Sequence, residues 1–132
     1  MPVNRQAVIK VENVSKEYAF GKQTLLALKD IDLTVFRGEF LALAGPSGSG
    51  KSTLLNLIGC IDTPSSGSIS IDGDKIADKT PNQLADLRAS KIGFVFQTFN
   101  LLPVLTAFEN VEYPLLRFRV NRARRRERVN RY

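Results

Sequence analysis

The chain has 132 residues, of which 43% are hydrophobic, and this size and composition fit one ordinary globular domain with its own core. No apolar run approaches the roughly 20 residues that a membrane-spanning helix needs, and residues 1–10 lack the apolar centre of a secretory signal. We therefore expect a soluble, cytosolic polypeptide without a signal peptide or transmembrane helix.

The net charge of +6 comes from one end of the chain, because residues 117–132 hold eight arginines and one acid, Glu127. The remaining residues are close to neutral, so we expect no nucleic-acid-binding surface. A solvated helix face or a frayed end is the expected role of the arginines, and attraction to phosphate or anionic lipid is the alternative.

The beginning of the chain predicts a small β-layer. Residues 7–14 have the composition of a strand, and a polar turn is expected around Lys16, Gly21 and Lys22. Residues 31–35 alternate apolar and polar side chains, the pattern of a strand with one face in water.

Residues 40–44 form a continuous apolar run, typical of a parallel strand that is covered on both faces. Directly after it, eight residues fit the phosphate-binding pattern G-x-x-x-x-G-K-[ST], and an apolar helix is expected from about Ser52 to Ile61. The eight residues are Gly45, Pro46, Ser47, Gly48, Ser49, Gly50, Lys51 and Ser52. A glycine-serine linker that happens to contain a lysine is the alternative.

This spacing has a physical cause. Glycines let the backbone curl so that successive N–H groups point inward at phosphate oxygens, and the helix dipole adds to the attraction. Lys51 then reaches the outer phosphates and the Ser52 hydroxyl ligates Mg²⁺, while Thr53 follows in the first helical turn. The sequence therefore predicts a site for a nucleoside triphosphate.

The second half of the chain predicts alternating strands and helices. Residues 68–72 form a strand that ends in an Asp72-Gly73 turn, for which turn chemistry is a better explanation than metal binding. Thr80 caps a helix, with Pro81 at its first position and Gln83 completing a capping box.

That helix is expected to bury Leu84 and Leu87, and residues 92–96 then form a second apolar strand that ends in Gln97. Thr106 and Glu109 form another capping box, opening a helix that Pro114 must kink or end. Cys60, the only cysteine, is expected to be a buried and unreactive side chain. The whole pattern predicts an α/β layered domain.

With the phosphate-binding loop, Gln97 and residues 99–106 read together, the chain resembles the ATP-binding subunits of ABC transporters, most closely the lipoprotein-release and macrolide-export subgroup. The resemblance implies a P-loop fold of the ABC type, of which this chain carries the N-terminal part. Residues 1–36 would form a β-layer, residues 37–97 the P-loop core, and residues 98–132 the start of a helical region with an arginine-rich end.

The resemblance also implies roles for individual residues. Tyr18 would stack on the adenine of ATP, the alternative being an aromatic side chain that only covers the β-layer. Gln97 would approach Mg²⁺ and the attacking water, the alternative being a hydrogen-bonding residue at a strand end. Lys51 and Gln97 are thus the candidate catalytic residues, with Ser52 and Gln97 as candidate metal ligands.

The partners are likewise implied by the resemblance. Residues 97–105 would face a transmembrane permease subunit, and the full-length domain would act as a homodimer on the cytoplasmic face of the inner membrane. An exposed apolar loop of this kind would mark an interface.

Three features of the family have no counterpart in the chain. It contains no Asp-Glu dipeptide after an apolar strand, no Leu-Ser-Gly-Gly-Gln signature and no histidine. We therefore expect the chain by itself to bind ATP with turnover near background, and to be marginally stable because the strand at residues 40–44 lacks a neighbour.

Two other functions are alternatives for a chain with this loop. A small P-loop kinase would need arginines spread through the body of the domain, whereas here they cluster at the end. A non-catalytic module could instead act through the basic end on lipid or nucleic acid, and its binding would then depend on salt.

Overall fold

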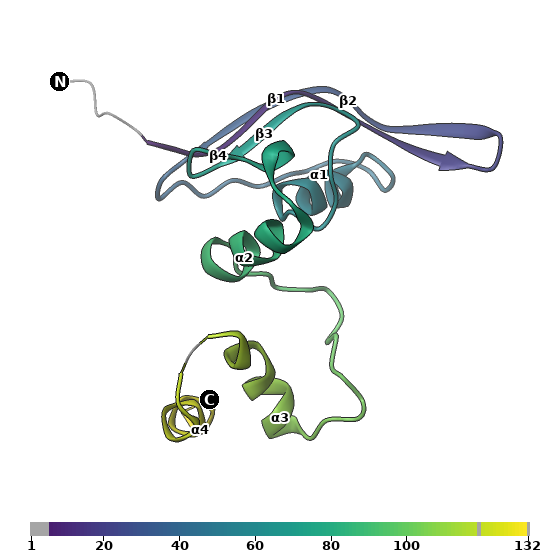
Figure 1. Cartoon of the computed structure of the whole chain (residues 1–132). Coiled ribbons are helices and arrows are strands. Elements are labelled where there is room, and N and C mark those ends of the chain that lie inside the picture. The colour runs from purple at the N-terminus through teal and green to yellow at the C-terminus, as the bar shows by residue number, and fades with distance from the viewer. Residues whose placement is uncertain (1–5, 119, 132) are drawn as a thin grey trace. The chain divides into compact units, whose positions relative to one another are not determined.

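A computed structural model describes residues 6–118 and 120–131 and divides the chain into two compact units, Met1–Ile92 and Gly93–Tyr132. The positions of these units relative to one another are not determined, so each is described by itself. The first unit holds a sheet and two α-helices, and the second holds short helices joined by irregular segments (Figure 1).

The first unit is built on a small antiparallel sheet. Among the described residues the sheet has four strands in the order β2-β1-β3-β4. The strands are β1 (Ala7–Phe20), β2 (Gln23–Phe36), β3 (Ser66–Ile71) and β4 (Asp74–Lys75). Because β3 pairs only with the part of β1 before residue 16, the far end of the β1–β2 hairpin is two-stranded and extends beyond the rest of the sheet (Figure 1).

The β1–β2 hairpin is longer than predicted. Its turn lies at Gly21 and Lys22, as expected, and Gly21 has the positive φ of 60° that favours glycine. Lys16 was wrongly placed in this turn, since it lies within β1 and is buried. Lysine is a poor strand former on its own, but here the carboxylate of Asp62, elsewhere in the unit, balances the charge of Lys16.

Two helices cover one side of this sheet (Figure 1). They are α1 (Lys51–Ile58) and α2 (Pro81–Lys91), and a 3-10 turn, η1 (Ile76–Asp78), precedes α2. Sheet and helices share one apolar core, whose members are Val11, Val14, Leu28, Leu54, Leu57, Cys60, Ile69, Ile71, Ile76, Leu84 and Leu87. The predicted burial of Cys60, Leu84 and Leu87 is therefore confirmed.

Helix α1 ends three residues earlier than predicted. Gly59 is its C-cap, and Cys60 has a positive φ of 55°, so the chain turns away before Ile61. Arg88 of α2 donates a hydrogen bond of 2.5 Å from Nη1 to the Cys60 carbonyl. A side chain from a distant helix thus satisfies a carbonyl at this helix end, which local periodicity could not reveal.

The turn and cap predictions for this unit are confirmed. Asp72 and Gly73 both have positive φ, 52° and 88°, and connect β3 to β4 as an Asp-Gly hairpin. The Thr80 side chain accepts a hydrogen bond from the backbone N–H of Gln83. In return, the Gln83 side-chain oxygen accepts one from the backbone N–H of Thr80. The carboxylate of Asp72 also pairs with Arg37 and Lys91, so this turn binds neighbouring segments of the same unit.

Two predicted strands are wrong. Residues 40–44 and residues 92–96 are extended segments without strand pairing, and no described residue forms a parallel ladder with either. Their side chains are largely exposed, with Phe40 at 94% of its maximum. An apolar run supplies the side chains of a central strand, but only a neighbouring strand can supply its hydrogen bonds.

The second unit contains α3 (Ala107–Glu112), η2 (Tyr113–Arg117) and α4 (Arg122–Val129). The predicted Thr106–Glu109 capping box is confirmed, and the α-helix gives way to a 3-10 turn at Pro114, as that residue requires. In α4 most arginines are exposed, which confirms the solvated face, whereas Arg125 bonds to Glu112 and to the Val120 carbonyl. No helix formed by the described residues is long and apolar enough to cross a membrane.

Candidate functional site

The phosphate-binding motif forms an exposed loop that leads into α1. Its last glycine, Gly50, is the N-cap of α1 and has a left-handed φ of 84°. A Cβ atom at this position would come within 2.7 Å of the Ala27 carbonyl oxygen and of a Leu28 methyl group in β2. Position 50 therefore requires glycine for two reasons: the left-handed backbone angle and the close approach of the loop to the sheet.

Lys51 closes the loop upon itself. Its ammonium donates hydrogen bonds to the Gly45 carbonyl at 2.8 Å, the Pro46 carbonyl at 2.7 Å and the Ser49 hydroxyl at 3.1 Å. All three acceptors are neutral, so the charge of the lysine is not balanced by these contacts. A phosphate oxygen is a stronger acceptor than a carbonyl, and the side chain is flexible enough to exchange one for the other.

The first turn of α1 is chemically open to an anion. Gly50 provides no side-chain cap and the turn contains no acidic residue, so the amides there face the exposed loop. These N–H groups carry the positive end of the helix dipole. Together with Lys51 they fit the phosphates of a nucleotide, and the exposed Ser52 hydroxyl in the same turn fits a magnesium ligand.

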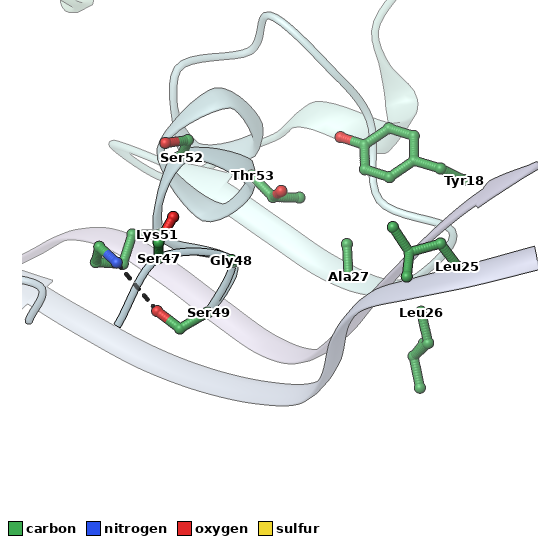
Figure 2. Close-up of a pocket in the computed structure, with 11 residues that line it drawn as sticks. Tyr18, Leu25, Leu26, Ala27, Ser47, Gly48, Ser49, Lys51, Ser52 and Thr53 are labelled. Atoms are coloured by element: carbon green, nitrogen blue, oxygen red, sulfur yellow. Dashed lines mark hydrogen bonds between the residues drawn. The ribbon is translucent and has the colours of Figure 1, made fainter. Parts of the chain in front are cut away.

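A cavity of about 450 Å³ connects this loop to the β1–β2 hairpin. Figure 2 shows the Tyr18 ring at one end of the cavity, directed toward Thr53 and the first turns of α1. The lining residues are Tyr18, Leu25, Leu26, Ala27, Ser47, Gly48, Ser49, Gly50, Lys51, Ser52 and Thr53. The cavity is thus lined by an aromatic ring, by apolar side chains of β2 and by residues of the loop that carries the G-x-x-x-x-G-K-[ST] motif.

Tyr18 is held by contacts of its own. Its hydroxyl donates a hydrogen bond of 2.9 Å to Asp62, and the Lys16 ammonium lies 4.9 Å from the centre of its ring. Burial and the bond to Asp62 raise the pKa of Tyr18, so the phenol stays protonated as a donor. Partial burial works to raise the pKa of Asp62, but hydrogen bonds from Lys16, the Thr63 amide and Tyr18 hold it below its ordinary value.

Gln97 lies in the second unit, where it is exposed in an irregular segment. Because the two units are not placed relative to one another, its approach to Mg²⁺ stays a prediction. The loop that follows is apolar and exposed, with Phe99 and Val104 about nine-tenths accessible. Its shape is fixed by Asn110, whose side-chain amide donates to the carbonyls of Leu102, Leu105 and Thr106 and accepts from the Leu102 amide.

A comparison with known families agrees with this geometry. The family model described as "ABC transporter" matches residues 28–132, which include the whole phosphate-binding loop. The chain belongs to the ABC transporter family of ATP-binding proteins. The predicted family is thereby confirmed.

Curated ABC relatives are similar over most of this chain. The uncharacterised ATP-binding protein MJ0796 of Methanocaldococcus jannaschii is 52% identical over 83% of the chain and 46% of its own length. YvrO of Bacillus subtilis is 51% identical over 92% of the chain and 53% of its own length. The macrolide export ATP-binding/permease protein MacB of Escherichia coli is 46% identical over 92% of the chain and 19% of its own length. The chain therefore spans about half or less of these relatives.

Solved ABC cassettes share the fold. The dimeric structure of the MJ0796 cassette matches 91% of the chain and 53% of its own chain, with 49% identity and a TM-score of 0.85. A post-hydrolysis dimer of the same cassette, bound to ADP and Pi, matches with a TM-score of 0.86 and 47% identity over 93% of the chain and 54% of its own. The predicted fold class, α/β of the P-loop ABC type, is confirmed.

Sequence reasoning missed two residues that contact Tyr18, Lys16 and Asp62, and in the second unit it missed Asn110. Lys16 stands two positions before Tyr18, a spacing that places both side chains on one face of a strand and could have associated them. Asp62 directly follows the helix predicted for residues 52–61, and nothing local indicates its bonds to β1. Asn110 lies four residues after the Thr106 cap, and no sequence signal singles it out.

Two negative findings complete the site. Among residues 6–118 and 120–131, no group of three or more His, Cys, Asp or Glu side chains could hold a metal ion. Burial raises the pKa of the Cys60 thiol, although the nearby Arg88 works to lower it, so the side chain stays protonated near neutral pH. A protonated thiol is a poor nucleophile and metal ligand, as expected from the sequence.

Proposed function

We propose that this chain acts as the nucleotide-holding part of an ABC transporter ATP-binding subunit. The observation that carries the proposal is the single cavity that runs from the Tyr18 ring to the phosphate-binding loop. Lys51, Thr53 and the backbone of residues 45–52, in which every residue except Pro46 has an N–H donor, hold the triphosphate, and the ring of Tyr18 holds the adenine. Ser52 and Gln97 are the proposed magnesium ligands.

The chemistry that MgATP supplies in such a subunit is transfer of the terminal phosphoryl group to water. The residues of this chain contribute binding and charge: the ammonium of Lys51 stabilises negative charge on the outer phosphates, and Gln97 orients the attacking water. Both roles follow from the family resemblance and the exposed charge of the loop.

We further propose that the 132 residues alone bind ATP but turn it over near background. A general base contributes about 10² to 10⁴ in rate, and the sequence contains neither an Asp-Glu dipeptide nor a histidine to act as one. A steady-state phosphate-release assay on the purified chain checks this, and brisk turnover without a companion protein would contradict it.

The proposed partners are a transmembrane permease and a second ATP-binding domain. Residues 97–105 offer the permease an apolar loop whose shape is fixed by Asn110. The MacB relatives are named as ATP-binding/permease proteins, and the MJ0796 cassette is described as dimeric. Export or lipoprotein extraction at the cytoplasmic face of the inner membrane is the process that we propose.

Substitution of Lys51 tests the central part of the proposal. Lys51→Ala removes the ammonium that faces the phosphates, and loss of a charged hydrogen bond predicts roughly a 10- to 100-fold lower affinity for MgATP. Titration calorimetry measures the affinity, and Lys22→Ala serves as the matched control because Lys22 is an exposed lysine in the hairpin turn. Unchanged affinity of Lys51→Ala would remove the proposed function.

A further inference from the structure

Three side chains at the base end of the cavity form one connected group: Lys16, Tyr18 and Asp62. The Asp62 carboxylate uses both oxygens. Oδ1 accepts from the Lys16 ammonium at 2.7 Å and from the Thr63 amide at 2.7 Å, and Oδ2 accepts from the Tyr18 hydroxyl at 2.9 Å. Lys16 also donates to the Thr63 carbonyl at 2.7 Å.

One member of this group, Lys16, differs from the other charged residues in its burial. Lys16 is the one charged residue that is buried in the described part of the chain, with its side chain 11% exposed against 30% for Asp62. Burying an ammonium is costly unless it is paired and hydrogen-bonded, as it is here. Balancing that charge occupies only one carboxylate oxygen, so the bond from Oδ2 to Tyr18 is an additional feature that the charge balance does not explain.

Asp62 connects the Tyr18 ring to the segment that follows α1. Asp62 follows α1 by four residues, and α1 begins at the phosphate-binding lysine, Lys51. The segment that follows α1 therefore holds the aromatic ring, while the first turn of α1 presents its amides to the phosphates. Helix α1 and the short turn after it thus connect the segment that holds the ring to the phosphate-binding loop.

Lys16 fixes which face of the ring is available. Its ammonium lies over one face of Tyr18, 4.9 Å from the ring centre, so a base can stack only on the opposite face. Lys16 and Tyr18 are two residues apart in β1, and this spacing puts both side chains on the same side of the strand.

We propose that Asp62 and Lys16 are positioning residues that hold the Tyr18 ring in place for the adenine before the nucleotide arrives. The inference rests on the proposed function and names two residues that contribute to base affinity without touching the base. A ring that is already ordered loses less conformational freedom on binding, so the nucleotide binds more tightly.

The test compares a ligand that has a base with one that lacks it. Tyr18→Phe keeps the ring and the Lys16–Asp62 pair and removes the hydroxyl, which bonds to Asp62 and also to the Thr53 side chain. We expect its affinity for MgATP to fall roughly 2- to 10-fold, the usual effect of leaving one side chain unordered, with unchanged affinity for magnesium tripolyphosphate. Tyr113→Phe, in the second unit, is the matched control and leaves both affinities unchanged.

Asp62→Asn and the double variant Tyr18→Phe/Asp62→Asn complete the comparison. Since both single changes act on the same contact between Tyr18 and Asp62, the double variant should lose no more ATP affinity than the larger single loss. A merely structural role would weaken both ligands together, so the ratio of the two affinities distinguishes positioning from general loosening. If Asp62→Asn does not fold by circular dichroism, Tyr18→Phe alone decides.

Each outcome has one reading. A lower ATP affinity with constant tripolyphosphate affinity in Tyr18→Phe supports the inference. Wild-type ATP affinity in Tyr18→Phe, or equal losses for both ligands, overturns it and leaves the proposed function standing, provided that Lys51→Ala still loses both ligands. If the folded wild-type chain binds neither ligand, the proposed function fails and the inference fails with it.

Discussion

Two kinds of apolar segment in this chain differ in whether they pair as strands and become buried. The strands β1, β2 and β3 alternate apolar and polar residues, and they pair into an antiparallel sheet whose inner face joins the core. Residues 40–44 and 92–96 are more continuously apolar, yet they are unpaired and largely exposed. Hydrophobicity alone does not make a strand, because the backbone N–H and C=O groups also need a partner.

The difference follows from where the partners lie in the chain. A hairpin brings its own partner within two residues, as β1 and β2 do around Gly21 and Lys22. A parallel strand needs a crossover of a dozen or more residues to reach a neighbour. The β1–β2 pairing is therefore local, although β3 joins β1 from much further along the chain. Residues 40–44 and 92–96 have no strand partner among the described residues.

Truncation of an apolar side chain should change the free energy of unfolding very differently in the two kinds of segment. Ile69 in β3 is 1% exposed, so Ile69→Ala should lower the free energy of unfolding by about 2 to 5 kcal/mol through lost burial and a cavity. Val95→Ala, in the unpaired segment 92–96, should change it by about 0.5 kcal/mol or less, because Val95 is fully exposed. Urea unfolding followed by circular dichroism measures both. Similar losses in the two variants would break the comparison.

The next test asks whether the paired sheet shapes the phosphate-binding loop. Gly50→Ala should cost about 1 to 2 kcal/mol for its left-handed backbone and more for the contact with Ala27 and Leu28, and should also weaken MgATP binding. Gly21→Ala is the matched control, since φ is also positive there but nothing lies within 4 Å of the added Cβ. Thermal unfolding and calorimetric titration give the two readouts. Equal effects of both substitutions would mean that the contact with β2 is unimportant.

Removing a helix cap should have different effects in a helix that packs on a core and in one that does not. Thr80→Ala should lower the free energy of unfolding by about 1 kcal/mol, because the cap it removes belongs to α2, which buries Leu84 and Leu87. Thr106→Ala removes an equivalent cap from α3, which buries no residue, so it should increase local amide exchange in α3 with little change in global unfolding. Hydrogen exchange by mass spectrometry separates the two. A global loss from Thr106→Ala would contradict the distinction.

The smallest expected effect concerns pH. The hydrogen bond from Lys91 holds the pKa of Asp72 below its ordinary value of 3.8, so this pair is fully formed at neutral pH. Because the pKa of Asp72 is lower in the folded state, the pair stabilises the fold fully above the ordinary pKa of 3.8. This stabilisation is lost as the pH falls further, through the lowered folded-state pKa. Asp72→Asn should therefore unfold with a weaker acid dependence than the wild type below about pH 4. An identical acid dependence in Asp72→Asn would exclude this contribution.

Much of the local structure could be read from the sequence. Both capping boxes, the Asp72-Gly73 hairpin and the helix after Lys51 depend on interactions within a few residues, and each is present. Lys16 could not be placed in this way, because its burial depends on Asp62, 46 residues further along the chain. The same holds for the end of α1, where Arg88 of another helix bonds to the Cys60 carbonyl.

The sequence by itself determined the chemistry of the phosphate-binding loop, since the glycines, Lys51 and Ser52 act through the backbone and side chains of one short segment. It also determined the family, because those residues and the segments around them form a pattern that is rare elsewhere. Only the tertiary structure decided how the base end of the cavity is built. There Asp62 and Lys16 bond to each other and contact Tyr18 across segments that are far apart in the chain, and such contacts leave no local pattern.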